Sequence, residues 1–220
     1  MMPNEFPTPI VTVDAVLMTL SDGALAVGLI KREQPPLVGV HALPGGYVHV
    51  QEDDTLEAAA ARILRDKAQV ECRFLEQLGT FSGATRDPRG WSLTVAYFAL
   101  VPAAELNAAD SMLSLHPLTD LPSLAFDHAA IIESAVTRLR GKSSYSALPA
   151  FLLPPLFTLS ELHATYQQVL GTRLDPASFR RKIIDQGIVE AADTRRVGAH
   201  RPAELYRLWA GKASPFQNRI

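Results

Sequence analysis

Apolar and polar positions alternate at the period of a β-strand in two segments near the N-terminus. Residues 11–20 and 24–30 are rich in Val, Leu and Thr, and the run Ser21-Asp22-Gly23 between them is typical of a tight turn. This pattern predicts a β-hairpin. Residues 74–81 and 93–101 have the same character and predict two further strands.

A helical period replaces this alternation after Gly45 and Gly46. Either Asp54 or Thr55 can cap the predicted helix, because a short oxygen side chain accepts a hydrogen bond from the first turn. The apolar positions that recur at helical spacing predict one buried stripe, formed by Leu56, Ala59, Ala60, Ile63 and Leu64.

A second helix is expected over residues 127–140, with Asp127 as its cap and Gly141 at its end. Residues 107–124 are poorly patterned and predict a loop that contains at most a short strand. The mixture of short strands with one central helix predicts an α+β or α/β sandwich.

The last third of the chain has a different pattern. Thr158 and Glu161 form a capping-box pattern, and the helix that follows ends at Gly171. Asp175-Pro176 begins a second helix, and residues 188–192 and 205–209 predict two strands around a basic loop. Two helices followed by a basic hairpin are the layout of a winged helix-turn-helix.

We therefore predict an N-terminal domain over residues 1–145, a linker over residues 146–156 and a winged helix over residues 157–220. The serines and prolines of residues 142–155 are typical of a linker, which makes this segment the expected hinge.

Composition narrows the class of protein. An apolar fraction of 47% and a charged fraction of 20% are those of a globular protein that buries a core. A single cysteine, Cys72, excludes a disulfide framework and a cysteine-based zinc site within one chain, which indicates a reducing cytoplasm. The longest apolar run, residues 147–157, is too short to span a membrane, so no membrane partner is expected.

The charge is unevenly distributed. The chain has a net charge of −2, but from residue 157 onward ten Lys and Arg residues face six Asp and Glu residues. A basic second domain indicates an anionic partner, and double-stranded DNA fits the predicted layout. The expected contacts are Ser178, Arg180, Arg181 and Lys182 on the second helix and Arg195, Arg196, His200 and Arg201 on the wing. The alternative is a dimerisation module whose arginines are only solvated.

The glycine turn and the helix after it resemble the Nudix box, whose pattern is Gly, five residues, Glu, seven residues, then Arg-Glu-apolar-x-Glu-Glu-x-Gly-apolar. Residues 62–70 align with its end and Asp54 takes the place of its first glutamate, although the loop is two residues longer. In that family three glutamates hold divalent cations beside a diphosphate. Those positions are Ile63, Asp66 and Lys67 here.

Only Asp66 remains as a carboxylate, and Lys67 places a positive charge where the metal would lie. We therefore expect a fold that holds a nucleotide diphosphate but has lost metal-assisted hydrolysis, with no catalytic residues and no metal beyond the residual Asp66. The alternative for Asp66 and Lys67 is a solvated helix face.

Both halves together resemble the Nudix-related transcriptional regulators of NAD metabolism, the NrtR family. The runs that carry the resemblance beyond the box are residues 86–90, 126–128, 157–162, 179–183 and 198–202. The resemblance implies an α+β chain with an N-terminal Nudix-like α/β/α sandwich and a C-terminal winged helix-turn-helix. It further implies a homodimeric repressor of NAD biosynthesis or salvage genes. It also implies a palindromic operator, release by ADP-ribose or a related nucleotide, and no required cofactor.

Candidate effector contacts follow from the chemistry of a diphosphate. Its charge suits Lys31, Arg32, Arg86 and Arg89, since the planar arginine fork donates to phosphate bidentately. Gly45 and Gly46 let the backbone approach the ligand, and Phe81, Tyr97 and Phe126 are candidates for stacking on the base. Each candidate has an alternative. Arg86 and Arg89 can form a salt-bridged turn around Asp87, the two glycines can serve only to make the turn, and the aromatic residues can belong to the core. His128 can be a capping or surface residue.

Two rival functions stay open. The first is an ADP-ribose pyrophosphatase with an accessory winged helix, which requires magnesium and new ligands from Glu52, Asp53 and Glu57. The second is a nucleotide-binding adaptor whose C-terminal domain binds a protein.

Overall fold

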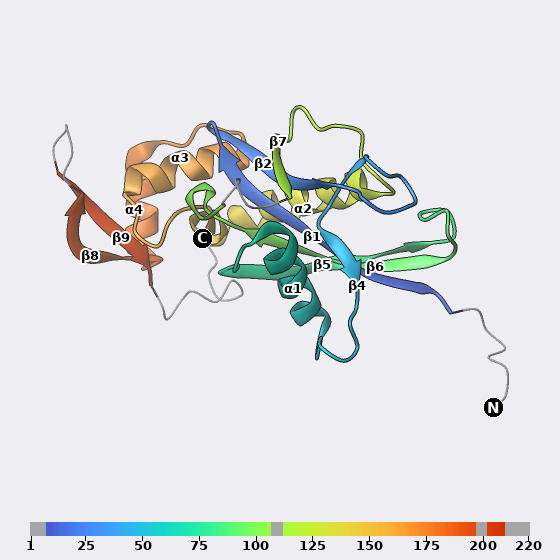
Figure 1. Ribbon diagram of the computed structural model, residues 1–220. Helices are drawn as coiled ribbons and strands as arrows, with labels where there is room; N and C mark the ends of the chain where they lie inside the picture. The colour runs from blue at the N-terminus through green and yellow to red at the C-terminus, as the bar shows by residue number, and fades with distance from the viewer. Residues whose placement is uncertain (1–7, 107–111, 197–201, 210–220) are drawn as a thin grey trace.

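The computed structural model describes residues 8–106, 112–196 and 202–209, and it places a mixed β-sheet between two helices with a winged helix at one end (Figure 1). None of the helices in these ranges is both long enough and apolar enough to cross a lipid bilayer.

The predicted hairpin is confirmed. Strands β1 (Ile10–Ser21) and β2 (Ala24–Lys31) pair antiparallel up to Ser21 and Ala24. Asp22 and Gly23 have φ values of 50° and 76°. Positive φ at both turn residues matches the twist of the flanking strands, and Asp-Gly adopts it readily.

The sheet is built around β1. Strand β6 (Ser92–Leu100) runs parallel to β1 and pairs antiparallel with β5 (Phe74–Gly83) at the edge. The strand order is β3-β2-β1-β6-β5, with β4 beside β1 and β7 beside β2. The short strands are β3 (His41–Ala42), β4 (Gly45–Tyr47) and β7 (Leu113–Pro117), of which β7 lies in the poorly patterned segment.

Helix α1 (Leu56–Ala68) covers one face of the sheet and α2 (His128–Ser143) covers the other (Figure 1). The Thr55 hydroxyl accepts a hydrogen bond from the Ala58 amide at 3.1 Å, so Thr55 is the cap of α1. The sheet therefore has one helix on each face, which confirms the expected sandwich.

The ends of α2 differ from the prediction. The Asp127 carboxylate makes no capping bond, because it accepts two hydrogen bonds from Arg86, and a charged bidentate pair is stronger than a cap. Gly141 does not end the helix, which continues to Ser143. The Ser143 hydroxyl is buried and donates to the Leu139 carbonyl at 2.6 Å.

The winged helix forms as predicted. Helix α3 (Leu159–Leu170) begins at a complete capping box between Thr158 and Glu161 and ends at the left-handed Gly171. Helix α4 (Pro176–Asp185) is capped by Asp175, and β8 (Val189–Arg196) pairs with β9 (Ala203–Leu208) to form the wing.

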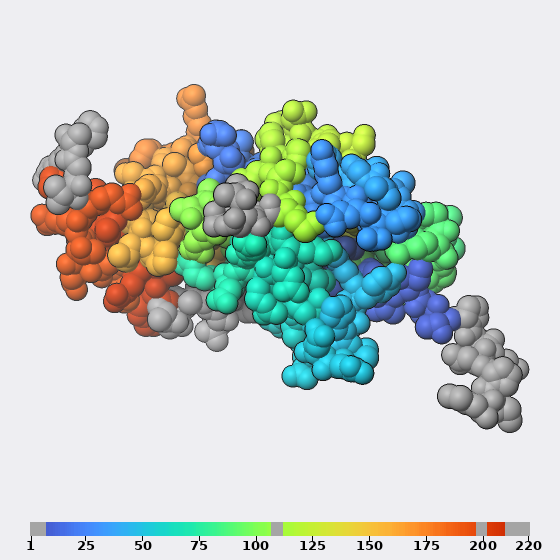
Figure 2. Space-filling view, viewed as in Figure 1, coloured from blue at the N-terminus to red at the C-terminus, as the bar shows by residue number. Residues whose placement is uncertain are grey.

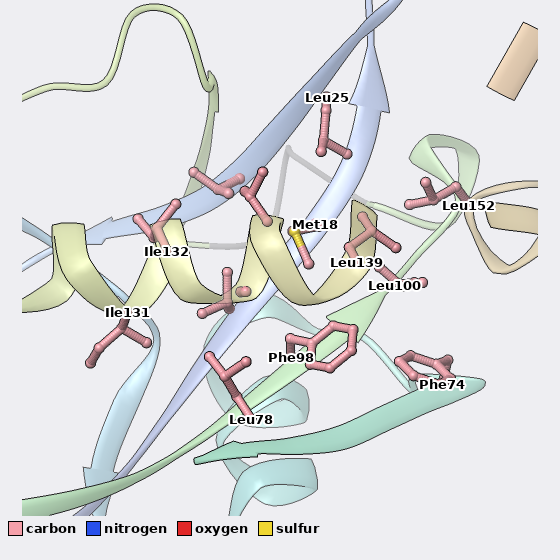
Figure 3. Close-up of a cluster of buried hydrophobic side chains, with 14 of the residues drawn as sticks. Met18, Leu25, Phe74, Leu78, Phe98, Leu100, Ile131, Ile132, Leu139 and Leu152 are labelled. Carbon is pink, nitrogen blue, oxygen red and sulfur yellow. The ribbon is translucent and has the colours of Figure 1, made fainter. Parts of the chain in front are cut away.

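The segment expected to be a linker is packed into the core. A 3-10 turn, η2 (Leu148–Leu152), buries all five of its residues. Leu148, Phe151 and Leu152 join the core between α2 and the sheet, whereas Ala147 and Ala150 join the core of the winged helix. Figure 3 shows Leu152 beside Leu139 and Leu100 in the first of these cores. The linker prediction is wrong because the serines and prolines are part of ordered structure: Pro149 lies in the first turn of the 3-10 helix, and Ser146 donates to the Lys142 carbonyl at 2.8 Å.

The two domains are consequently in direct contact. The buried Tyr166 hydroxyl of α3 donates to the Ser146 carbonyl at 2.9 Å, and burial raises the pKa of Tyr166. The tip of the β1–β2 hairpin also reaches α3: a Cβ atom at Gly23 would lie 3.6 Å from Gln168 Nε2. In the space-filling view the orange atoms of α3 lie against the blue hairpin (Figure 2).

Leu139 tests this shared core. It is fully buried on α2, so truncation to Ala leaves a cavity, and we expect Leu139→Ala to lower the free energy of unfolding by about 2–5 kcal/mol. The exposed Thr137→Ala on the same helix should change it by no more than about 0.5 kcal/mol. Urea denaturation followed by circular dichroism measures both, and equal midpoints for the two variants would contradict the assignment of this core.

Candidate functional site

A cleft of about 390 Å³ opens where the glycine turn meets the loop after β2, the loop between β5 and β6, and the start of α2. Its size falls in the range of small-molecule sites. Seven of the nine predicted ligand contacts line it, namely Lys31, Arg32, Gly45, Gly46, Arg86, Arg89 and Phe126.

Two arginines of the cleft are held by carboxylates. Arg86 donates to both oxygens of Asp127, at 3.0 and 2.8 Å, and its side chain is 9% exposed. Arg89 donates to both oxygens of Asp87, at 3.0 and 2.7 Å, and to the Tyr47 hydroxyl at 2.8 Å. Arg89 therefore forms the salt-bridged turn around Asp87, whereas Arg86 pairs with Asp127 at the start of α2.

These pairs set the charge of the cleft. The hydrogen bonds from Arg89 lower the pKa of Asp87, and the same bonds raise the pKa of Arg89. Both groups are ionised near neutral pH, and the guanidinium groups keep fixed orientations before any ligand enters.

Arg32 is oriented by an aromatic ring. Its guanidinium carbon lies 4.7 Å from the centre of the Phe126 ring, and its nitrogens donate to the carbonyls of Pro36 and Gln34 at 2.8 and 3.1 Å. Phe126 has φ 54°, a left-handed conformation that is unfavourable for a bulky residue. The chain turns sharply here, which places Phe126 in the cleft immediately before α2 begins.

The other two predicted stacking residues do not reach the cleft. Tyr97 is 5% exposed and packs with Val13 and Ile63 beneath α1. Phe81 is partly buried against the core on the α2 face. Both lie on β-strands whose side chains enter the two cores, so their expected contact with a base is corrected.

Gly45 is required by a close approach. A Cβ atom at this position would lie 1.9 Å from Asp14 Oδ1, whereas one at Gly46 would make only ordinary contact with Ile63 at 3.8 Å. The glycine at position 45 thus leaves room for a carboxylate from β1.

The Nudix-box positions do not form a cation site. Ile63 is 1% exposed in the core, and Asp66 is half exposed beside Arg62 and Arg65. The Lys67 ammonium donates to the Gly45 carbonyl, and burial lowers the pKa of Lys67. Magnesium requires several oxygen ligands, and this set supplies one carboxylate that already has basic partners.

The longer loop does not replace the missing ligands. Asp53 accepts two hydrogen bonds from Arg62, both at 2.8 Å, and these lower the pKa of Asp53 to about 2. Glu52 lies beside His49, and Glu57 is exposed in the first turn of α1. Within residues 8–106, 112–196 and 202–209, no three His, Cys, Asp or Glu side chains gather where they could hold a metal ion. The residues present do not fit the magnesium site of the Nudix box.

Several residues of the cleft were not anticipated as ligand contacts. They are Thr12, Asp14, Tyr47, Lys67, Asp87, Met112 and His128. His128 is 3% exposed and its Nδ1 atom accepts from the Leu43 amide at 2.9 Å, which corrects the expectation of a surface or capping histidine. A single carboxylate within the apolar segment 11–20 was the feature of the sequence that could have identified Asp14 as a site residue. Its position beside His128 is set by the fold.

The basic face of the winged helix is exposed as expected. Ser178, Arg180, Arg181 and Lys182 are exposed on α4, and no salt bridge to a described residue holds the three basic side chains. Arg195 is exposed on β8. Arg196 donates to Glu161 Oε1 at 2.5 Å and so ties the wing to α3. His200 and Arg201 lie outside the described residues.

Comparison with known proteins assigns both domains. A family model of the NUDIX domain matches residues 8–135, and a model described as the NrtR DNA-binding winged helix domain matches residues 149–208. The chain is 40% identical over 210 residues to the ADPR responsive transcriptional repressor NtrR of Acinetobacter baylyi, which covers 93% of this chain and 84% of that protein.

Solved structures of Shewanella oneidensis NrtR are similar over the same length. The structure complexed with a 27mer DNA has 38% sequence identity and a TM-score of 0.88, and it covers 96% of this chain and 99% of that one. The NUDIX domain of that protein, complexed with ADP ribose, has 39% identity and a TM-score of 0.57, and covers 63% of this chain and 94% of that one. The order of the two domains, the cleft between glycine turn and α2, and the extent of these matches place this chain in the NrtR family.

Proposed function

We propose that this protein is a transcriptional repressor that binds an operator through its winged helix and releases it when ADP-ribose occupies the Nudix cleft. The observation that carries the proposal is a nucleotide-sized cleft lined by arginines in which the position of a metal ligand is taken by Lys67. Such a cleft suits binding of a diphosphate without its hydrolysis.

The diphosphate has suitable partners in the cleft. Arg32, Arg89 and Lys31 line one side, and phosphate oxygens accept hydrogen bonds from such groups. Phe126 offers the single aromatic face among the predicted stacking residues that lies in the cleft. The base or a ribose of the effector can pack against this ring.

Hydrolysis of a diphosphate at a Nudix box depends on divalent cations that stabilise developing charge. A lysine ammonium at position 67 supplies no ligand to a cation and repels it. The pyrophosphatase alternative is therefore disfavoured, and so is the recruitment of Asp53, which is already engaged by Arg62.

Helix α2 provides the physical connection between effector and DNA. Its first residues, with Asp127 just before them, line or support the cleft. At its other end Arg140 Nε donates to the Val169 carbonyl in the last turn of α3, at 3.1 Å. A ligand that draws Arg86 away from Asp127 alters the start of α2, and the rigid helix transmits this to α3. Such a ligand acts by binding one arrangement more tightly than the other.

On the DNA side, α4 enters a major groove and the wing contacts the backbone. The repressor acts as a cytoplasmic homodimer on a palindromic operator of NAD biosynthesis or salvage genes, with half-sites about 34 Å or a multiple apart. Residues 1–145 form the effector domain and residues 157–220 the DNA-binding domain, joined by residues 146–156.

The lack of a fitting magnesium site predicts that the cleft binds ADP-ribose without cleaving it. Incubation of ADP-ribose with the purified protein and magnesium should leave the nucleotide intact, while calorimetry detects saturable binding that a chelator does not abolish. Chromatography for AMP is the measurement. Release of AMP in excess over protein, abolished by the chelator, would make the protein a hydrolase and overturn the argument from Ile63 and Lys67.

The exposed basic side chains of α4 predict a direct contact between this helix and DNA. Arg181→Ala should weaken operator binding by about 1–3 kcal/mol if it reads a base, or weaken all sequences alike and reduce the salt slope by about one if it contacts phosphate. Arg65→Ala, an equal loss of charge on α1, is the matched control and should leave the affinity unchanged. Fluorescence anisotropy with operator and scrambled DNA at several salt concentrations separates these outcomes. Equal affinities of the Arg181→Ala and wild-type proteins would remove α4 from the interface.

The contact between Arg140 and Val169 predicts a route that couples effector binding to operator binding. Arg140→Ala removes the contact between α2 and α3, and changes along such connections alter coupling by about 0.5–2 kcal/mol. The ratio of operator affinities without and with saturating ADP-ribose should therefore fall. Arg138 of the same helix contacts Glu76 on β5 instead, so Arg138→Ala should preserve the ratio. An unchanged ratio in Arg140→Ala would exclude this contact as the route.

A further inference from the structure

Asp14 is a buried carboxylate without a hydrogen-bond donor. Its side chain lies on β1 at the floor of the cleft and is 9% exposed. No described residue donates a hydrogen bond to its oxygens, and the nearest basic atom of an ion pair is His128 Nε2, 3.8 Å from Oδ1. Because Asp14 lines the cleft, a bound group can supply the hydrogen bond that the described residues do not.

The polypeptide makes room for this carboxylate. Any side chain at Gly45 would occupy the space of Asp14 Oδ1, since a Cβ atom there would be 1.9 Å away. Lys67, whose ammonium is bonded to the Gly45 carbonyl, and Arg32 add favourable charge nearby. Neither of these neighbours donates a hydrogen bond to the Asp14 oxygens.

His128 presents a donor beside that acceptor. Its Nδ1 atom accepts from the Leu43 amide at 2.9 Å, so in the neutral ring the proton is on Nε2. Burial lowers the pKa of His128, which favours the neutral ring. The Nε2 hydrogen and Asp14 Oδ1 thus lie side by side on the cleft floor, with one donor and one acceptor.

The separation of these two atoms selects the ligand group. At 3.8 Å they are too far apart for a direct hydrogen bond, whereas one oxygen at about 2.8 Å from each can bond both. That oxygen must accept from Nε2 and donate to Oδ1. A hydroxyl does both, a phosphate oxygen only accepts, and an amino group of a base only donates.

We propose that Asp14 Oδ1 and His128 Nε2 form a hydroxyl subsite that binds a ribose hydroxyl of the effector. This inference rests on the proposed function, because the ribose is delivered by the diphosphate held at Arg32 and Arg89. The subsite gives the cleft two chemical ends, a cationic side for phosphate and a carboxylate floor for sugar. It selects a diphosphate that carries a ribose over a diphosphate alone.

The test compares ADP-ribose with inorganic pyrophosphate, which has the phosphates but no ribose. Asp14→Asn removes the charge of the acceptor at constant shape, and we expect ADP-ribose binding to weaken about 10-fold or more, as for loss of a charged hydrogen bond. Pyrophosphate binding should stay equal or tighten, since a negative charge has left the cleft. Glu33→Gln, an equal charge loss elsewhere in the cleft, should move both ligands in the same direction.

A second variant guards against misfolding of the first. Asn at position 128 keeps a side-chain acceptor for the Leu43 amide and removes the Nε2 donor, so His128→Asn should weaken ADP-ribose several-fold and leave pyrophosphate unchanged. Calorimetry measures all four proteins, with thermal melts to establish folding.

The possible results distinguish a failure of the proposed subsite from a failure of the proposed function. Wild-type protein that binds ADP-ribose, with Asp14→Asn and His128→Asn equal to it, would overturn the subsite alone. A parallel loss of both ligands in folded variants would do the same, because it indicates support of the cleft rather than recognition of the sugar. Wild-type protein that binds pyrophosphate but not ADP-ribose would overturn the proposed function and the subsite together.

Discussion

Burial of one face of α2 is the interaction on which both halves of this molecule depend. Ile131, Ala135 and Leu139 are fully buried between the sheet and the segment that leads into the winged helix. The same core contains Leu152 of η2 (Figure 3) and also Val169 of α3, so it does not stop at the end of the Nudix domain. A core is close-packed, and a displacement of α2 cannot be absorbed without moving its neighbours.

This continuity changes how a ligand can act on DNA binding. A flexible linker would leave the two domains free to reorient, and a ligand would then need to create an interface. Here the interface already exists, through Tyr166 and Ser146 and through Arg140 and Val169. The ligand needs only to favour a different packing of α2, and its differential affinity for the two packings sets the size of the response.

Lys67 changes the chemistry that the cleft offers to a ligand. Loss of the carboxylates alone would leave an empty position, but Lys67 fills it with a cation bonded to the glycine turn. Arg86 and Arg89 are meanwhile engaged by Asp127 and Asp87, so under the proposed function an entering diphosphate would compete with these carboxylates instead of meeting free cations. That competition costs affinity, yet it ties occupancy of the cleft to the start of α2.

Local patterns determined the elements of this protein. The hairpin, the Thr55 cap, the capping box at Thr158 and the Asp175-Pro176 start of α4 depend on contacts between residues close in sequence, so they were predictable. The diphosphate ligand suggested by the Nudix box and the NrtR resemblance also led to seven of the residues that line the cleft. Tertiary structure decided the rest: Tyr97 lies in the core and Phe81 packs against it, Arg86 pairs with a residue 41 positions away, and residues 148–152 are buried. The Asp14 and His128 pair brings together β1 and α2 across 114 positions, and no local preference encodes a distance of 3.8 Å between them. Periodicity reports which face of an element is buried, but only packing determines which buried groups meet.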